Sequence, residues 1–293
     1  MSRQQRCDLR NGLLFVSPWL IGLVAWELYP ILASLYYSLC EYSVLTPAAW
    51  IGLDNYRDLF TDEVFWKALS NTGFYAAFAL PLDLICGIAL ALLLNTKVRG
   101  MVFYRAIFFV PSLVPMIALA ILWLWMFNAQ YGVVNYALGA IGLPGPRWLV
   151  DPAWAKPALV LMSLWGIGRA VVVYLAGLQD VPVHLYESAD LDGASWHHKI
   201  RHITLPMISP VIYFNLILGI IGVMQVFAVP YVMTGGGPAR ATLFYTMYLY
   251  DNAFTYLRMG YACAMAWMLF LLILGLTLIA TKVSERHVYY AGK

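Results

Sequence analysis

Long apolar segments alternate with short polar segments along the whole chain. An α-helix rises 1.5 Å per residue, so about 20 apolar residues are enough to cross a hydrocarbon core of about 30 Å. Six segments reach that length, which predicts an all-α polytopic membrane protein with six transmembrane helices. The expected spans cover residues 13–39, 68–94, 106–127, 157–178, 207–233 and 260–281.

The composition supports this prediction. Of 293 residues, 62% are hydrophobic and 11% are charged, whereas soluble domains carry about 25% charged residues. The spans leave no space for a large soluble domain, so we expect a single transmembrane domain over residues 1–293. The first apolar run continues to about Leu39, beyond the length of a signal-peptide core, and is interpreted as a retained span.

The basic residues are distributed unequally between the two sets of loops. One set comprises the N-terminus, residues 95–105, residues 179–205 and the C-terminus, and it holds 11 of the 18 Lys and Arg residues. Positive residues accumulate on the cytoplasmic side of membrane proteins. Both termini and the loop 179–206 are therefore expected in the cytoplasm. The six basic residues of the opposite loops are Arg57, Lys67, Arg147, Lys156, Arg240 and Arg258.

The loop 179–206 has the pattern of two short helices separated by a turn. Pro182 suits the first turn of a helix, because its missing N–H has no partner there in any case. The first helix should then run over 184–191 and stop at Asp192-Gly193, since glycine tolerates positive φ. Ser195 can cap a second helix over 196–202, and Leu205-Pro206 should begin the next span.

The first of these helices is expected to have two different faces. Apolar and acidic side chains alternate on it, with Leu185, Ala189 and Leu191 set against Glu187, Asp190 and Asp192. One face can lie against the membrane domain while the other meets a partner. The pattern alone is equally compatible with an interfacial helix that only orders the loop.

A fixed set of spacings in this loop resembles a known family. The pattern E-x-A-x-x-D-G-A, followed after five residues by I-x-x-I-x-L-P-x-x-x-P, is similar to the EAA loop of the inner-membrane permeases of bacterial ABC importers. Ser188 stands where that family commonly has a second Ala, and Ile200 where it usually has Phe. The matching residues are Glu187, Ala189, Asp192, Gly193, Ala194, Ile200, Ile203, Leu205, Pro206 and Pro210.

Four further stretches resemble the carbohydrate permeases of the maltose and glycerol-3-phosphate type, and within them the maltose-F or glycerol-phosphate-A kind of subunit. The resemblance extends from about Leu13 to Val283. The stretches are 52–56 (GLDNY), 65–72 (FWKALSNT), 165–168 (WGIG) and 234–238 (TGGGP).

The resemblance implies the fold of an ABC type I importer permease with cytoplasmic coupling helices, in the cytoplasmic membrane of a bacterium or archaeon. Such a subunit moves a sugar, oligosaccharide, polyol or glycerol phosphate by alternating access. Its loop docks on a partner ATPase, and Glu187 and Gly193 should be the most sensitive positions. The implied coupling residues are Glu187, Ser188, Ala189, Asp192, Gly193, Ala194, Leu205 and Pro206.

The same resemblance implies several partners. These are a second, similar permease, an ATPase dimer, an extracytoplasmic solute-binding protein and membrane lipid, with no nucleic acid. The chain has no G-x-x-x-x-G-K-[ST] phosphate loop, so ATP and Mg²⁺ are expected in the partner ATPase and no cofactor in this chain. Signatures of hydrolases such as H-E-x-x-H and G-x-S-x-G are also missing from the sequence, which favours a transport subunit over an enzyme.

Neither the cysteines nor the histidines have the spacing of a ligand set. Cys7, Cys40, Cys86 and Cys263 are scattered, which favours neither a disulfide framework nor a zinc site. The loop histidines, His184, His197, His198 and His202, are interpreted as solvated side chains.

Three ionisable residues, Glu27, Asp83 and Arg169, fall near span centres, where a charge is costly unless it pairs or faces a wet interior. Asp83 and Arg169 are the first pair to test. Glu27, beside Tyr29-Pro30, is alternatively closer to an interface.

The fourth and fifth spans combine small and hydrogen-bonding residues, and in maltose-type relatives these two helices line the sugar site. Glycine-rich helix faces also serve as close-packing surfaces, so that interpretation stays open. An ion-coupled secondary carrier that uses Asp83 and Arg169 is the alternative function, although it would ordinarily have two related halves. The expected pathway residues are Asp83, Gly166, Arg169, Gly219, Gly222 and Gln225.

Overall fold

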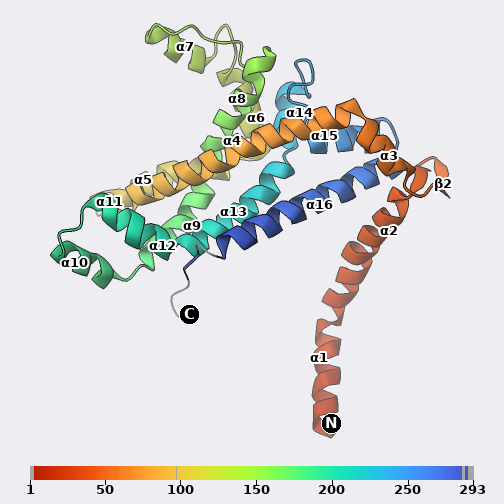
Figure 1. The fold of residues 1–293 in the computed structure, drawn as a ribbon, viewed down its shortest axis with the longest axis horizontal. Coiled ribbons are helices and arrows are strands. Elements are labelled where there is room, and N and C mark those ends of the chain that lie inside the picture. Colours follow the sequence, from red (N-terminus) through yellow and green to blue (C-terminus); the bar gives the residue numbers. More distant parts are fainter. Residues whose placement is uncertain (1–2, 97, 286–287, 290–293) are drawn as a thin grey trace. The chain divides into compact units, whose positions relative to one another are not determined.

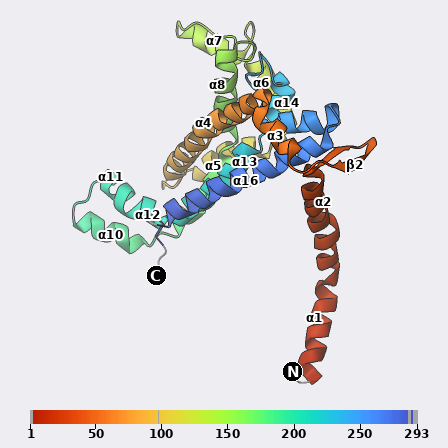
Figure 2. The ribbon, with the colours of Figure 1, turned by 45° about the vertical axis from the view of Figure 1, so that its right-hand side comes forward.

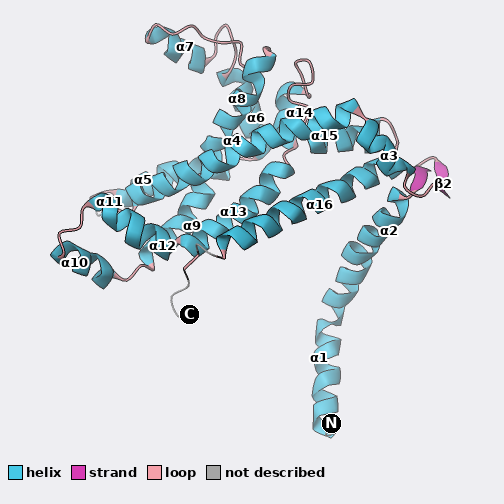
Figure 3. Ribbon diagram, in the orientation of Figure 1, coloured by secondary structure: helices cyan, strands magenta, loops and turns pink. Residues whose placement is uncertain are grey.

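The computed structural model describes residues 3–96, 98–285 and 288–289. These residues group into two compact units, unit 1 (Met1–Asp62 and Leu249–Phe270) and unit 2 (Glu63–Tyr248 and Leu271–Lys293). Helices dominate both units, and Figure 3 shows the single hairpin of strands that belongs to the described part of unit 1. The expectation of one membrane domain over 1–293 stays a prediction.

Unit 1 contains the first helical segment, the hairpin and the start of the last helix. Its elements are α1 (Arg3–Gly22), the π-helix η1 (Leu23–Leu28), α2 (Tyr29–Ser38), β1 (Cys40–Ser43), β2 (Thr46–Trp50), α3 (Asp54–Thr61), the π-helix η5 (Asp251–Thr255) and the first part of α16 (Met259–Ser284). The two strands pair antiparallel, with Cys40 opposite Trp50.

Asn55 fixes the corner of unit 1 where α2 meets the hairpin. Its amide nitrogen donates to the carbonyl oxygens of Ser38 and Cys40, both at 2.9 Å. The first bond satisfies a carbonyl that the end of α2 leaves without an intrahelical partner, and the second ties the same amide to the start of β1. A Cβ on Gly260 would lie 2.1 Å from the Cys40 carbonyl oxygen, so α16 begins in direct backbone contact with this corner.

Unit 2 holds the second part of α16 and the remaining helices, of which α15 extends two residues into unit 1. They are α4 (Glu63–Leu94), α5 (Met101–Phe109), the 3-10 helix η2 (Val110–Leu113), α6 (Met116–Met126), α7 (Val133–Ala140), α8 (Pro152–Ser163), the 3-10 helix η3 (Leu164–Gly166), α9 (Gly168–Gln179), α10 (Val183–Leu191), α11 (Trp196–Lys199), the π-helix η4 (Ile200–Thr204), α12 (Leu205–Met207), α13 (Ser209–Met224), α14 (Ala228–Thr234) and α15 (Tyr245–Tyr250). In both ribbon views α10 and α11 lie at one end of this unit and α7 and α14 at the other (Figures 1 and 2).

Four helices among the described residues are long and apolar enough to cross a membrane, and two bent helix pairs bring the number to six if each pair is one span. The four are Asp8–Ser38, Glu63–Leu94, Ser209–Thr234 and Met259–Ser284. The all-α class is thus confirmed, and these helices overlap the predicted span ranges, whose place in a membrane stays a prediction.

The third and fourth expected spans differ from straight helices. Met101–Leu113 and Met116–Met126 meet at 98°, and Pro152–Gly166 and Gly168–Gln179 meet at 48°. Val114 is extended, with φ −68° and ψ 131°, because a residue that precedes proline is disfavoured in the α region. The Val114-Pro115 step thus breaks what the hydropathy pattern presented as one helix over 106–127.

The core of unit 2 forms around α4, which packs against α8, α9 and α13. At Gly87 this packing is close, since an added Cβ would lie 3.1 Å from the ring of Tyr174. One buried cluster gathers Tyr75, Trp123, Phe127, Trp148 and Phe244. A second cluster, around Tyr174, Leu178 and Ile208, lies where α9 and α13 meet.

Candidate functional site

The loop between α9 and α13 contains a well-defined helix end. α10 runs over Val183–Leu191 with Pro182 as its N-cap residue, close to the predicted 184–191. At its C-terminus the Ala194 N–H donates to the Ala189 carbonyl (2.8 Å) and the Gly193 N–H to the Asp190 carbonyl (3.1 Å). This is a Schellman motif, which requires a left-handed residue after the cap. Gly193 provides it with φ +71°.

The second half of the loop departs from the prediction in two places. Ser195 is the N-cap residue of α11, but its hydroxyl lies 2.9 Å from His198 Nδ1 instead of capping a backbone N–H. The helix also continues as η4 and α12 through Leu205 and Pro206, and the break before α13 falls at Ile208 (φ −90°, ψ 3°). The π-helical turn of η4 accommodates the proline ring, so Pro206 bends the path without ending it.

Two side-chain contacts hold the two halves of this loop together. The Tyr186 hydroxyl lies 2.9 Å from the Thr204 hydroxyl, and Lys199 forms an ion pair with Asp190. Leu205 and Pro206 are half-buried where the loop joins α13. Four of the predicted coupling residues are exposed: Glu187, Ser188, Asp192 and Gly193. Two others, Ala189 and Ala194, are half-buried. The loop is therefore ordered from within. Its outer face combines the acidic side chains with Leu191, which is 90% exposed and does not lie on the covered face expected for it.

A cavity of about 540 Å³ lies between α4, α6, α8 and the α13–α14 segment. This volume is in the range of small-molecule sites, about 300–1,000 Å³. The fifth span is interrupted here, because α13 ends at Met224 and α14 begins at Ala228. Discontinuous helices are typical of solute sites near the middle of transporters.

The cavity brings together five of the six residues predicted for the pathway. These five are Asp83, Gly166, Gly219, Gly222 and Gln225. An added Cβ on Gly166 or Gly222 would meet no atom within 4 Å, whereas one on Gly219 would lie 2.4 Å from Leu80 Cδ1. Gly166 and Gly222 therefore widen the cavity, and Gly219 serves helix packing as well. Asp83, Ser163 and Gln225 are its polar side chains amid an apolar lining.

The sixth residue predicted for the pathway, Arg169, does not line this cavity. Its Nε and Nη2 atoms donate to the Ser112 carbonyl oxygen at 3.2 and 3.0 Å, and it is not among the described residues that line the cavity. Neither Asp83 nor Arg169 takes part in the ion pair found between Lys199 and Asp190. The expected pair of Asp83 and Arg169 is thus not formed, because the carbonyl at the end of η2 occupies the guanidinium.

The remaining ionisable candidates fall outside this site. Glu27 is exposed in η1. The His198 and His202 rings stack with centroids 5.6 Å apart, and no group of three or more potential metal ligands occurs among the described residues.

Sequence reasoning missed the residues that connect α4 with the segment after α14. The Asn71 amide donates to the carbonyls of Arg240 (2.8 Å) and Leu243 (3.0 Å), and the Thr72 hydroxyl accepts from the Tyr245 N–H (2.9 Å). Burial raises the pKa of the Tyr245 hydroxyl, which stays neutral. Asn71 and Thr72 are the last two residues of the stretch FWKALSNT. The family resemblance therefore included them in the sequence analysis, but it did not indicate their partners.

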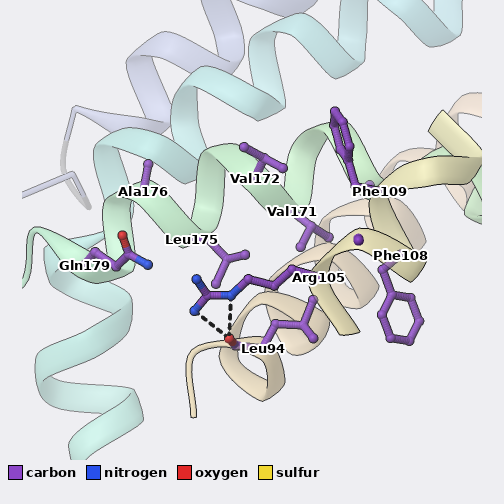
Figure 4. Close-up of a pocket in the computed structure, with 11 residues that line it drawn as sticks. Leu94, Arg105, Phe108, Phe109, Val171, Val172, Leu175, Ala176 and Gln179 are labelled. Atoms are coloured by element: carbon purple, nitrogen blue, oxygen red, sulfur yellow. Dashed lines mark hydrogen bonds between the residues drawn. The ribbon is translucent and has the colours of Figure 1, made fainter. Parts of the chain in front are cut away.

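A further pocket of about 410 Å³ lies between α4, α5 and α9. Figure 4 shows Arg105 extending across it toward the end of α4. Its Nε and Nη2 atoms donate to the Leu94 carbonyl oxygen at 3.2 and 2.9 Å. A cation at a helix C-terminus is favourable, so Arg105 has a structural role that this geometry explains.

Residues 83–288 match the family described as binding-protein-dependent transport system inner membrane component. The matched region includes the loop, the end of α4 from Asp83 on, the other cavity helices and the C-terminal span. The chain belongs to this family.

Curated relatives match along almost the entire length. The probable ABC transporter permease protein YesP of Bacillus subtilis is 37% identical, with 100% of this chain and 96% of the relative covered. The sulfoquinovosyl glycerol transport system permease protein SmoG of Agrobacterium fabrum is 34% identical (94% and 91% covered). The trehalose/maltose transport system permease protein MalF of Thermococcus litoralis is 33% identical (95% of each covered).

A solved structure has the same fold. It is a bacterial ABC transporter involved in the import of the acidic polysaccharide alginate, with a TM-score of 0.85, 26% identity, and 97% of this chain and 99% of that chain covered. Together with the family match, this likeness confirms the ABC type I permease fold. The binding-protein-dependent inner membrane component described here is thus a multi-pass protein of the cytoplasmic membrane.

Proposed function

We propose that this chain is one of two permease subunits of an ABC importer that moves a carbohydrate into the cytoplasm. The coupling loop, defined as residues 179–206, transmits the closure of an ATPase dimer to the spans. ATP and Mg²⁺ are bound by that partner ATPase, and an extracytoplasmic binding protein delivers the solute. The chain itself catalyses no reaction.

The observation that carries the proposal is the placement of the loop relative to the cavity. α13 carries the cavity residues Gly219 and Gly222, and Gln225 follows its last residue, while α9 joins the Gly166 wall through the 48° bend at Ile167. A displacement of α10 therefore moves both walls. The Schellman motif and the Tyr186 contact make the loop a unit that can transmit force.

The carbohydrate class is supported by the relatives and by the cavity. The relatives SmoG and MalF are permeases of sulfoquinovosyl glycerol and of trehalose/maltose transport systems, and the solved importer takes part in the import of alginate. In this chain Asp83, Ser163 and Gln225 offer hydrogen-bonding groups for hydroxyls, and apolar walls suit the C–H faces of a sugar ring. A sugar, oligosaccharide, polyol or glycerol phosphate fits this description.

The alternative, an ion-coupled secondary carrier, has less support. It requires Asp83 to titrate against a partner in the pathway, yet Arg169 donates to the Ser112 carbonyl. Family membership also points to a system that depends on a binding protein.

Uptake by the assembled importer tests the proposal. The chain is co-expressed with the adjacent permease, ATPase and binding-protein genes, purified, and reconstituted in vesicles, and uptake of radiolabelled sugars is followed. We expect uptake to need ATP and the binding protein, and Glu187→Lys to abolish it, since the reversed charge opposes any basic partner surface. Uptake that follows an ion gradient without ATP would support the carrier instead.

A further inference from the structure

Unit 2 contains a larger cavity, of about 990 Å³, at the end away from α10 and α11. It is lined by the end of α6, the segments on either side of α7, and the turn that follows α14. We call it the outer cavity, because its loops lie on the side predicted to be extracytoplasmic. α6 and α14 also line the 540 Å³ cavity, through Leu119 and Val229. The two cavities therefore follow one another along the same pair of helices.

Arg147 is the one charged side chain among the described residues that line the outer cavity. The neutral polar side chains there are Asn128, Gln130 and Thr234, and the aromatic ones are Phe127 and Trp148. The Arg147 side chain is exposed, and it forms no ion pair within the described residues. Its guanidinium is thus available to an anion that enters the cavity.

The backbone around Arg147 is held by a part-buried hydrogen-bond network centred on Asn135. Asn135 Nδ2 donates to the Pro146 carbonyl (3.1 Å), and the Trp148 Nε1–H donates to Asn135 Oδ1 (2.7 Å). The residues on both sides of Arg147 are therefore held by one amide. Trp148 is only 6% exposed and packs on Phe127 with ring centroids 5.3 Å apart. Arg147 consequently projects from a rigid turn, which lowers the entropic cost of binding.

These groups have the chemistry of a site for an acidic sugar. A guanidinium binds a carboxylate through two parallel, charge-assisted hydrogen bonds. Asn and Gln amides pair with ring hydroxyls, and aromatic faces pack against sugar C–H groups. An isolated cation beside a low-dielectric wall also raises the local concentration of anionic solutes.

We infer that the outer cavity is an access subsite that selects acidic carbohydrates, with Arg147 binding their carboxylate. This inference rests on the proposed import function and narrows its solute. Arg147 acts as a specificity determinant at the outer end. In the 540 Å³ cavity the hydroxyls of the solute, and not its carboxylate, pair with Asp83 and Gln225 during translocation.

Binding to the purified importer, with its partner subunits and in nanodiscs of neutral lipid, tests the inference. The probes are digalacturonate and α-1,4-galactobiose, which differ only at the oxidised C6 position, and saturation-transfer NMR measures each affinity. We expect digalacturonate to bind about tenfold more tightly at low salt, the effect of one charge-assisted hydrogen bond pair. The preference should shrink as salt screens the exposed cation.

Two variants separate the site from general electrostatics. Arg147→Gln should reduce the preference to about one, and Arg147→Lys should retain part of it. Arg240→Gln removes an equal charge from the same set of loops but from a residue that does not line the cavity, and it should leave the preference unchanged. Equal affinity for both sugars, no binding of either, or a loss of preference in Arg240→Gln would overturn the inference.

The outcome also distinguishes a protein contact from a sugar contact. If Arg147→Gln leaves the sugar preference intact but lowers the stimulation of ATP hydrolysis by the binding protein, Arg147 is a docking residue and the inference is wrong. Uptake of a neutral sugar that depends on ATP and Glu187 would preserve the proposed function in that case.

Discussion

The coupling loop and the 540 Å³ cavity differ in what holds them together. The loop is stabilised by local contacts, such as the Ala194–Ala189 hydrogen bond and the Asp190–Lys199 ion pair. The cavity exists only because α4, α6, α8 and α13 meet, and its polar groups come from distant parts of the chain. The loop can therefore be damaged without altering the cavity, and the cavity can be filled without altering the loop.

The largest effect is expected from Gly193→Val. Gly193 has φ +71°, and a left-handed conformation costs an L-residue about 1–2 kcal/mol, more when it is β-branched. The Schellman motif should open, and ATP-driven uptake should fall at least about tenfold. Gly100→Val is the matched control, since Gly100 has φ +84° in another loop. If uptake falls equally in the two variants, the loss comes from backbone strain at a left-handed glycine, and the coupling loop has no special role.

Gly222→Leu should have the next largest effect. Nothing lies within 4 Å of an added Cβ at Gly222, so the protein can fold while the new side chain enters the cavity. Overpacking against the solute, at about 1–3 kcal/mol, should lower uptake about tenfold while the ATPase still co-purifies. Gly275→Leu, also in open space but outside the cavity, should transport normally. Normal uptake by Gly222→Leu would exclude this cavity as the pathway.

Arg169→Gln should affect stability more than transport. The variant loses a charged hydrogen bond to Ser112 that supports the contact between η2 and α9. We expect the free energy of unfolding in detergent to fall by about 1 kcal/mol, with the KM for uptake unchanged. An increased KM with unchanged stability would restore the earlier expectation of a solute contact.

The smallest effect is expected from Lys199→Gln. The Asp190 side chain is 63% exposed, and exposed ion pairs contribute about 0.2–1 kcal/mol. Thermal unfolding should change little, and uptake should stay within about twofold of the wild type. A loss comparable to that of Gly193→Val would give this pair a direct role in coupling.

The difference between local contacts in the loop and long-range contacts around the cavity also explains which features the sequence could predict. α10, its end at Asp192-Gly193 and the positions of the spans depend on local patterns, and they are close to the structure. The partner of Arg169 is the Ser112 carbonyl, which the end of η2 leaves without a helical N–H, and it lies 57 residues away in the chain, so no local pattern could identify it. Asn71 and Arg240 are 169 residues apart, so their contact was equally out of reach. The five cavity residues were found through chemical type, and their proximity required the fold.

The central claim is that the acidic face of α10 contacts the ATPase. Benzoylphenylalanine incorporated in place of Glu187, which is exposed, should crosslink on illumination to a chain that carries a phosphate-binding loop, identified by mass spectrometry. The same residue in place of Tyr186, whose hydroxyl contacts Thr204 within the loop, should crosslink internally. A Glu187 position that reacts only with lipid or solvent in the active importer would contradict the account.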